Sequence, residues 1–210
     1  MEWQFDSQVA DIFHQHARQH IPDYERVLDL TVDLCEQKLS KDSPILEVGC
    51  AVGETVSRLH ELGFSNIHAV DNSQAMIDKC DPAWATYYCS DSFPAVGDVK
   101  FAAVLCNWTM HFMPDKVSYL KSIADHTEPG GMLILSEKTE NSGLALEQYH
   151  LYKSRQGVSD SDIESKAKSL VGVMHIDPID VYMSLLRIVG FREIHIANAN
   201  WCFTTFVATK

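Results

Sequence analysis

Ile45-Leu-Glu-Val-Gly-Cys-Ala-Val-Gly-Glu-Thr-Val56 is the stretch that decides the fold. A short, mostly apolar run leads into a glycine turn, and the turn leads into a helical pattern, as in nucleotide-binding α/β proteins. The turn departs from the dinucleotide-binding pattern, because Ala51 stands where a middle glycine would let the backbone approach a pyrophosphate. No Gly-Lys-Ser/Thr sequence follows, so the pattern of a P-loop is also missing. The turn therefore favours a nucleoside-like ligand without a phosphate chain.

Strands and helices alternate after this turn. Strand-like runs lie at 44–48, 66–70, 85–89, 101–106 and 131–136, with helical patterns at 54–62, 73–80 and 115–126. Short apolar strands separated by amphipathic helices predict a parallel sheet with helices on both faces. Two further strand-like runs, 192–197 and 201–208, follow each other closely and predict an antiparallel pair. We therefore expect a Rossmann-like α/β fold with a seven-stranded, mostly parallel sheet and an antiparallel last strand.

We interpret the 210 residues as a single domain with two helical additions. Residues 1–42 hold two amphipathic helical patterns and are expected to form an N-terminal lid. Residues 43–136 are the expected cofactor-binding core. Residues 137–177 then interrupt the strand–helix rhythm with two helical patterns that break near Gly157, and we expect a helical cap there. Residues 178–210 complete the domain with a helix and the final pair of strands.

The composition narrows the class of partner. The formal net charge is −12, with 29 acidic residues against 17 basic ones. Proteins that grip nucleic acid release counterions from its phosphates with Lys and Arg, so this balance weighs against nucleic acid and favours a small molecule. The chain has no run of 18 apolar residues and starts without a signal-peptide pattern, so we expect no membrane span and a cytoplasmic location. The six cysteines have no Cys-x-x-Cys spacing and the His, Asp and Glu residues are scattered along the chain, so we expect no metal site.

Polar residues follow four successive strands of the predicted sheet. Asp71 ends the second strand about 20 residues after the glycine turn, where an acidic residue hydrogen-bonds ribose hydroxyls. Glu47 could receive an ammonium group, Asp91 an exocyclic adenine amine, and Asn107 the amino-acid end of a ligand. These strand ends meet in one crevice, because ligands of open α/β sheets bind outside the carboxyl ends of the strands. S-adenosylmethionine fits this set of groups, although each residue taken singly is as easily a turn, packing or capping residue.

Longer motifs extend the argument. The segments "LEVGCAVG", "AVDNSQAM", "LCNWTMHF" and "EPGGMLILSEK" make the chain similar to class I S-adenosylmethionine-dependent methyltransferases. The segments "WQFDSQVADIF", "IPDYERV", "YKSRQGVSDSDIESK" and "NWCFTTFVA" make it resemble, over almost its whole length, the carboxy-S-adenosylmethionine synthases, which use prephenate and serve tRNA wobble-uridine modification. The resemblance implies a homodimer. Together with the strand-end argument it gives the expected cofactor-binding residues, which are Tyr24, Glu47, Gly49, Cys50, Ala51, Gly53, Asp71, Asn72, Met76, Asp91, Ser92 and Asn107.

One position departs from the synthase pattern. That family is expected to hold its added carboxylate with an arginine in the helix before Gly190-Phe191, and this sequence has Leu185 at the aligned position. Arg187 lies two residues further on and should face elsewhere on a helix. We therefore expect an apolar wall beside the transferable group and a preference for unmodified S-adenosylmethionine, because an isolated carboxylate is costly to bury.

We assign the expected catalytic and acceptor-binding residues from their positions in the predicted fold. His111, just after the fourth strand, is either a general base or a helix residue with a satisfied ring. The expected acceptor-binding residues are Trp108, Tyr149, His150, Tyr152 and Arg155, each of which could equally be a packing or solvent-exposed residue. Three functions remain open: a small-molecule methyltransferase, a carboxy-S-adenosylmethionine synthase that uses a substitute cation such as Arg155 or Arg187, and a catalytically silent cofactor-binding regulator.

Overall fold

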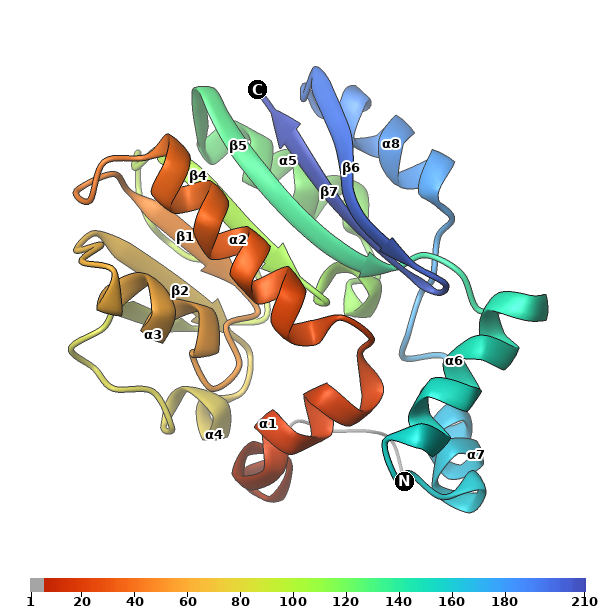
Figure 1. The fold of residues 1–210 in the computed structure, drawn as a ribbon. Coiled ribbons are helices and arrows are strands. Elements are labelled where there is room, and N and C mark those ends of the chain that lie inside the picture. The colour runs from red at the N-terminus through yellow and green to blue at the C-terminus, as the bar shows by residue number, and fades with distance from the viewer. Residues whose placement is uncertain (1–5) are drawn as a thin grey trace.

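A computed structural model describes residues 6–210 and shows one seven-stranded sheet with helices on both faces (Figure 1). The spatial order of the strands is β3-β2-β1-β4-β5-β7-β6. The strands are β1 (Ile45–Val48), β2 (Ile67–Asp71), β3 (Thr86–Cys89), β4 (Phe101–Asn107), β5 (Thr127–Lys138), β6 (Glu193–Asn200) and β7 (Phe203–Thr209). Residues 1–5, which begin the expected N-terminal lid, lie outside the described residues.

The strand directions confirm the predicted topology. Strands β3, β2, β1, β4 and β5 pair in parallel, and β7 runs antiparallel to both β5 and β6. Strand β1 is buried along its whole length, as the continuous apolar character of a central parallel strand predicts. Strand β5 is longer than expected, and it extends through Glu137 and Lys138 to the same edge at which β1 and β4 end.

The helices surround the sheet, and all of them except α4 fall into three groups. They are α1 (Ser7–His20), α2 (Tyr24–Lys38), α3 (Glu54–Glu61), α4 (Gln74–Ile77), α5 (Lys116–His126), α6 (Gly143–Arg155), α7 (Asp160–Ser169) and α8 (Ile179–Ile188), with a 3₁₀ turn, η1, at Met110–Phe112. Helices α2 and α3 cover one face of the sheet, and α5 and α8 cover the other (Figure 1). The third group, α1, α6 and α7, lies beyond the carboxyl ends of the parallel strands (Figure 1).

Two apolar layers hold the sheet between its helices, because successive side chains on a strand point to opposite faces. On one face Ile45 packs with α2 and α3 residues, and on the other Leu46 packs with residues of α5 and α8. Each fully buried aliphatic side chain contributes about 1.5–3 kcal/mol of transfer free energy. Strand ends are therefore held rigidly at the edge where the third group of helices faces them.

The N-terminal arm and the cap form one helical layer. Helix α1 contacts α6, and α6 contacts α7. The Tyr152 hydroxyl donates to the carbonyl oxygens of Arg18 (2.6 Å) and Ile21 (3.2 Å), where α1 ends. Within residues 6–210 no helix is both long and apolar enough to span a membrane.

Candidate functional site

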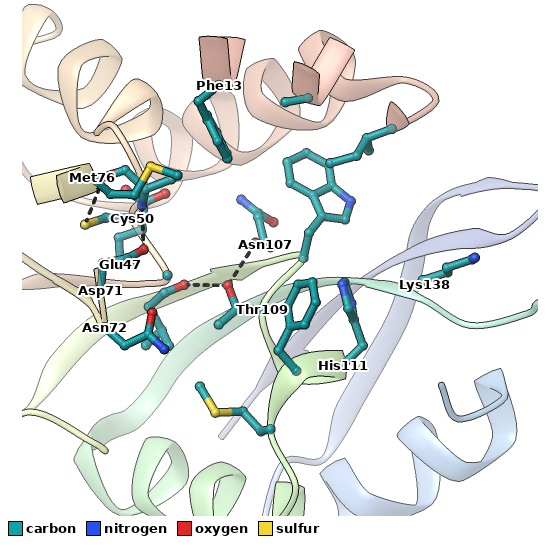
Figure 2. A pocket seen from close by; sticks show the side chains of 18 of the residues that line it. Phe13, Glu47, Cys50, Asp71, Asn72, Met76, Asn107, Thr109, His111 and Lys138 are labelled. Carbon is teal, nitrogen blue, oxygen red and sulfur yellow. Dashed lines mark hydrogen bonds between the residues drawn. The ribbon is translucent and has the colours of Figure 1, made fainter. Parts of the chain in front are cut away.

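A cavity of about 460 Å³ lies between the strand ends and this helical layer (Figure 2). Its volume is within the range of about 300–1,000 Å³ that is usual for small-molecule sites. The ends of β1, β2 and β4 form one side, and residues of α1, α6 and α7 form the other. Figure 2 shows Glu47 and Asp71 on one side of this space and Lys138 on the opposite side.

The glycine turn approaches its surroundings too closely for a side chain. Gly49 has φ of 73°, and a Cβ atom there would lie 1.9 Å from Thr109 Oγ1. The Thr109 hydroxyl is held in place by the carbonyl oxygens of Val48 (3.3 Å) and Asn107 (3.1 Å). Ala51 also has a left-handed backbone, with φ of 47°. Gly49 is therefore required both by its backbone conformation and by its neighbour.

Asp71 ties the second strand to this turn. Its Oδ2 accepts a hydrogen bond from the Ala51 backbone (2.9 Å), and its Oδ1 accepts one from the Ser73 backbone (2.9 Å). Burial raises the pKa of the Asp71 carboxyl, while these backbone donors act in the opposite direction. Asp71 thus has a structural role in the turn that its expected contact with a ribose would share.

Glu47 and Asn107 present polar atoms that nothing in the described chain satisfies. Glu47 Oε2 and both side-chain polar atoms of Asn107 are buried without a hydrogen-bond partner, and both residues line the cavity. Burial raises the pKa of Glu47 to about 8. An unsatisfied buried polar group costs about 1–3 kcal/mol, so this pair indicates where the polar groups of a ligand belong.

Tyr24 and Trp108 close the cavity below the arm. Their rings stack with centroids 4.9 Å apart, and Trp108 adopts φ of 56° in doing so. The Tyr24 hydroxyl donates to Glu54 Oε2 (3.0 Å), which also contacts His14 Nδ1 (2.8 Å), and Arg18 bonds to Oε1 (2.6 Å). Burial alone would raise the pKa of Glu54, but these partners lower it. One carboxylate therefore joins α1, α2 and α3.

His111 forms a buried pair with Glu137. The distance from His111 Nδ1 to Glu137 Oε2 is 2.6 Å, and the Glu137 side chain has no exposed area. Glu137 also accepts from the backbone nitrogens of Thr109, Met110 and His111. An ionised carboxylate only accepts hydrogen bonds, so Nδ1 carries a proton, and in the neutral form of the ring Nε2 is the nitrogen with the lone pair. His111 also lines the cavity, and its ring is hydrogen-bonded at one nitrogen.

The opposite end of the cavity carries cations. Lys138, at the end of β5, and Lys166, on α7, line the cavity, and the Lys166 ammonium donates to His16 Nε2. The ammonium groups of Lys138 and Lys153 lie 4.6 and 4.2 Å from the Tyr149 ring centroid. Burial lowers the pKa of Lys138 and of Lys153 to about 8, and that of Lys166 to about 7.

Thirteen of the expected site residues line the cavity. They are Tyr24, Glu47, Gly49, Cys50, Ala51, Asp71, Asn72, Met76, Asp91, Asn107, Trp108, His111 and Tyr149. The remaining five, which do not line it, are Gly53, Ser92, His150, Tyr152 and Arg155. Gly53 caps α3, and the Tyr152 hydroxyl donates a hydrogen bond to a backbone carbonyl near the end of α1. Ser92 and Arg155 face solvent. These residues therefore do not border the cavity.

The expected apolar wall at Leu185 is wrong. Leu185 packs against the apolar layer under α8 and does not border the cavity, and neither does Arg187. The reason is geometric, since α8 covers a face of the sheet (Figure 1), while the residues that line the cavity lie at and beyond the strand ends. On its cap side the cavity instead meets Lys138 and Lys166.

Sequence reasoning missed Glu54, Glu137, Lys138 and Lys166. Glu137 and Lys138 had a signal, because they end the fifth strand in "LSEK" and the strand-end argument was applied to only the first four strands. Lys166 had none, because its place depends on how the cap folds back. Within residues 6–210 no group of three or more His, Cys, Asp or Glu side chains is arranged to hold a metal ion.

Comparisons with known proteins agree with this geometry. The sequence profile of a family described as a methyltransferase domain matches residues 14–170. Carboxy-S-adenosyl-L-methionine synthases from Shewanella pealeana and Shewanella piezotolerans are 30% and 31% identical, over the whole chain and 93% of each relative. A Thermotoga maritima structure described as an S-adenosylmethionine-dependent methyltransferase, possibly acting on histamine, shares the fold with a TM-score of 0.72 at 16% identity, covering 99% of both chains. Synechocystis magnesium protoporphyrin IX methyltransferase with bound SAH gives 0.70 at 14% identity, covering 98% of this chain and 96% of that one.

Proposed function

This chain belongs to the class I S-adenosylmethionine-dependent methyltransferases, in the family that includes the carboxy-S-adenosyl-L-methionine synthases, and from that premise we propose that it transfers a methyl group to a small-molecule acceptor. S-adenosyl-L-methionine is the cofactor of this family. The observation that carries the proposal is the pair of unsatisfied residues, Glu47 and Asn107, at neighbouring strand ends beside the glycine turn. The ammonium and carboxylate of an amino acid would supply the missing partners.

The residues of the sheet end fit this cofactor. Asp71 would hold ribose hydroxyls, Asp91 the adenine amine, and Glu47 and Asn107 the amino-acid group, while the turn at Gly49 has no room for a phosphate-binding side chain. Cys50, Ala51, Asn72, Met76 and Tyr24 would complete the enclosure from the turn, the second strand end and the lid. When bound, the cofactor supplies an electrophilic methyl group on a sulfonium.

The protein's own contribution to the reaction is positioning and proton removal. Holding two reactants in the right geometry can supply several kcal/mol of the barrier reduction, about 7–11 in well-oriented cases. His111 Nε2 would accept the proton of the acceptor nucleophile, and Glu137 would hold the ring and stabilise the resulting imidazolium. Trp108 and Tyr149 would form the wall against which the acceptor packs.

A second candidate is the synthesis of carboxy-S-adenosylmethionine. Its support is the 30% and 31% identity over the whole chain to relatives with that name, and the two lysines on the cap side of the cavity. The argument against it from Leu185 falls, because Leu185 does not border the cavity. A silent regulator is disfavoured, since such a protein would have its cap packed shut, whereas the cavity here continues to α6 and α7.

Mass spectrometry of the ligand released from purified protein tests the choice. Methyl transfer predicts unmodified S-adenosylmethionine or its demethylated product, with no carboxylated cofactor on addition of prephenate. The appearance of the carboxylated cofactor would replace the first candidate by the second. Absence of any cofactor binding, measured by calorimetry with S-adenosylhomocysteine, would remove both.

A homodimer in the cytoplasm belongs to the same proposal. The resemblance to the synthase family supports the dimer, and Val171 and Ile188, which are 80% and 73% exposed, offer apolar surface outside the cavity. Light scattering at micromolar concentration should give twice the mass of the chain. A monomer would remove this part of the proposal without touching the cavity.

A further inference from the structure

The geometry points to an oxidation site beside the glycine turn, at which Cys50 and Cys80 form a disulfide with a hydroperoxide as the oxidant and thereby weaken cofactor binding. Both residues are free thiols in this structure. The inference goes beyond the proposed function and rests on it in one consequence only, the loss of cofactor affinity. Formation of the disulfide is measured independently of the cofactor.

The two sulfur atoms meet at one backbone oxygen. Cys50 lies in the glycine turn after β1, and Cys80 follows the short helix α4 after β2. Sγ of Cys50 lies 3.9 Å and Sγ of Cys80 lies 3.6 Å from the carbonyl oxygen of Ala51. The parallel pairing of β1 with β2 brings the two segments that follow these strands to the same edge of the sheet. The pair is therefore built by the fold and not by a Cys-x-x-Cys sequence.

Cys80 has the properties of the nucleophile and Cys50 those of its partner. The interaction with the Cys50 thiol lowers the pKa of the Cys80 thiol, whereas the same interaction and burial raise the pKa of Cys50. Burial raises the pKa of Cys35, Cys106 and Cys202. The thiolate is the form that reacts with a peroxide, so Cys80 is oxidised before these buried thiols.

The Tyr87 hydroxyl adds to the nucleophilic character of Cys80. This hydroxyl is buried and otherwise without a hydrogen-bond partner. It lies with the sulfur beside the turn, because a Cβ atom on Gly53 would be 2.9 Å from Cys80 Sγ and 3.6 Å from the Tyr87 oxygen. Like Cys50, it lowers the pKa of the Cys80 thiol, against the effect of burial. A hydroxyl beside an ionised sulfur stabilises the charged form by hydrogen bonding.

A small oxidant reaches the pair from the cavity. Cys50 and Ala51 line the cavity, and Figure 2 shows Cys50 and Asp71 on the same side of it. Cys50 and Cys80 are 3% and 9% exposed, so large reagents are kept out. Hydrogen peroxide is little larger than water and fits a space of about 460 Å³. A cofactor bound at the sheet end would cover this wall, so we expect oxidation when the cavity is empty.

The reaction consumes one hydroperoxide in two steps. The Cys80 thiolate attacks one oxygen of hydrogen peroxide, the O–O bond breaks, and the leaving hydroxide takes up the proton that Cys80 has lost, so that Cys80 becomes a sulfenic acid. The Cys50 sulfur then attacks the Cys80 sulfur, the S–O bond breaks, and the leaving hydroxide takes the proton of Cys50. Two thiols and one peroxide thus give one disulfide and two waters. The sulfurs are oxidised and the peroxide oxygens are reduced.

The disulfide would displace the glycine turn. The thiols are unbonded here, so at least one sulfur must move to reach bonding distance. The neighbour of Cys50, Ala51, is fixed by the hydrogen bond from its backbone nitrogen to Asp71 Oδ2 (2.9 Å). Movement of Cys50 therefore disturbs the bond that joins the turn to the second strand. By linkage, a bound cofactor must oppose the disulfide by the same factor by which the disulfide opposes the cofactor.

Peptide mapping tests the site itself. The reduced full-length protein is treated with hydrogen peroxide, free thiols are alkylated, and the non-reduced tryptic digest is analysed by mass spectrometry. We expect a link between Cys50 and Cys80, with the loss of two hydrogens, that dithiothreitol reverses. Tandem spectra distinguish Cys80 from Cys89, which lies in the same tryptic peptide, 80–100. A different disulfide, or a sulfonic acid at Cys80 without any link, would overturn the inference.

Calorimetry tests the consequence. S-adenosylhomocysteine should bind the oxidised protein at least about tenfold more weakly than the reduced protein. In a glutathione redox buffer, saturating S-adenosylhomocysteine should raise the reduction potential of the disulfide by the matching amount, about 30 mV for a tenfold difference. Unchanged affinity in the fully oxidised protein would overturn the inference. Absence of binding to the reduced protein would contradict the proposed function, whereas the disulfide stands or falls by the peptide map.

Matched variants locate the effect. Cys80→Ala should abolish the disulfide and the peroxide-dependent loss of affinity, and leave the affinity of the reduced protein unchanged. Cys89→Ala is the control, because Cys89 is exposed and should leave the response to peroxide as in the native protein. A loss of affinity that persists in Cys80→Ala would contradict the assignment. Reversal by dithiothreitol in the native protein gives the same test without any substitution.

Discussion

The two ends of the cavity differ in the ionisable side chains that line them. The sheet end presents Glu47 and Asp71 from the carboxyl ends of adjacent strands, and the cap end presents Lys138 and Lys166. The sheet end is fastened by backbone hydrogen bonds, whereas the cap end depends on side chains that approach from separate helices. Acidic side chains thus line one end of the cavity and basic side chains the other.

This difference between the sheet end and the cap end indicates which part of the cavity can change its ligand specificity. The glycine turn at the sheet end has no room for a Cβ at Gly49, so this end tolerates little change of sequence. The cap end has no comparable constraint from the backbone. The predictions below test this asymmetry, beginning with the largest expected effect.

Replacing Gly49 should have the largest effect. Gly49→Ala places a methyl group 1.9 Å from Thr109 Oγ1 and forces alanine to φ of 73°, so we expect several kcal/mol of destabilisation and no measurable cofactor binding. Gly63→Ala is the control, because Gly63 also has positive φ (89°) but no atom within 4 Å of the added carbon. It should cost about 1 kcal/mol in urea unfolding and leave cofactor affinity unchanged. Normal binding by Gly49→Ala would break the comparison.

His111 lies between the two ends, and its removal should affect turnover rather than binding. His111→Ala should lower kcat by about 10²–10⁴-fold with little change in cofactor affinity, since it removes a general base. Glu137→Gln should lower kcat with an unchanged KM, because the amide can turn its NH₂ group to Nδ1 and favour the other tautomer. Nitrogen NMR of the imidazole would show that exchange of tautomers. An unaltered tautomer and unaltered kcat would leave Glu137 as a support of η1 only.

Asp71 should matter less than Gly49 but more than any residue of the cap for cofactor affinity. Asp71→Ala should weaken S-adenosylmethionine binding by about 1.5–3 kcal/mol, the range for hydrogen bonds to charged groups. Part of the loss would come from the Ala51 backbone, which loses its acceptor. Asp71→Asn keeps one oxygen, so its affinity for S-adenosylmethionine, measured by calorimetry, should lie between that of Asp71→Ala and that of the native protein. Unchanged affinity in Asp71→Ala would remove the ribose assignment.

Glu47 should give the smallest but most specific signal, a proton released on cofactor binding. Its raised pKa of about 8 means that the free protein at pH 7 holds this carboxyl mostly protonated. An ammonium group beside it lowers the pKa, so about one proton should be released at pH 7 and none above about pH 9.5. Calorimetry in two buffers of different ionisation enthalpy measures the number of protons. Glu47→Gln should abolish the release, and a release that persists in this variant would assign it elsewhere.

The same raised pKa sets the sign of a stability change. Between the unfolded pKa of about 4.3 and the folded value, the folded state binds the extra proton, so the stability of the ligand-free protein falls as pH rises. Glu47→Gln should remove this loss and be more stable than the native protein at pH 8.

The sequence predicted the sheet end well and the cap end poorly, for physical reasons. Strand topology follows from local periodicity, and parallel strands bring Glu47, Asp71 and Asn107 to one edge without knowledge of any helix. Trp108 and Tyr149, which the sequence predicts to contact the acceptor, also line the cavity. Lys166 and Glu54 could not be found this way, because their positions depend on packing between helices far apart in the chain. Leu185 was misplaced because alignment by one motif cannot tell which face of the fold a helix covers.

The stack of Trp108 on Tyr24 has a practical consequence. Of the four tryptophans, Trp3 lies outside the described residues, Trp201 is 54% exposed, and Trp84 packs beside the apolar layer under α3. Trp108 therefore stands out among the described indoles as one whose ring lines the cavity, in contact with the phenol that reaches Glu54. We therefore expect a molecule that packs against this indole to change its fluorescence emission. The intrinsic fluorescence of Trp108 can therefore be used to screen acceptors without a label.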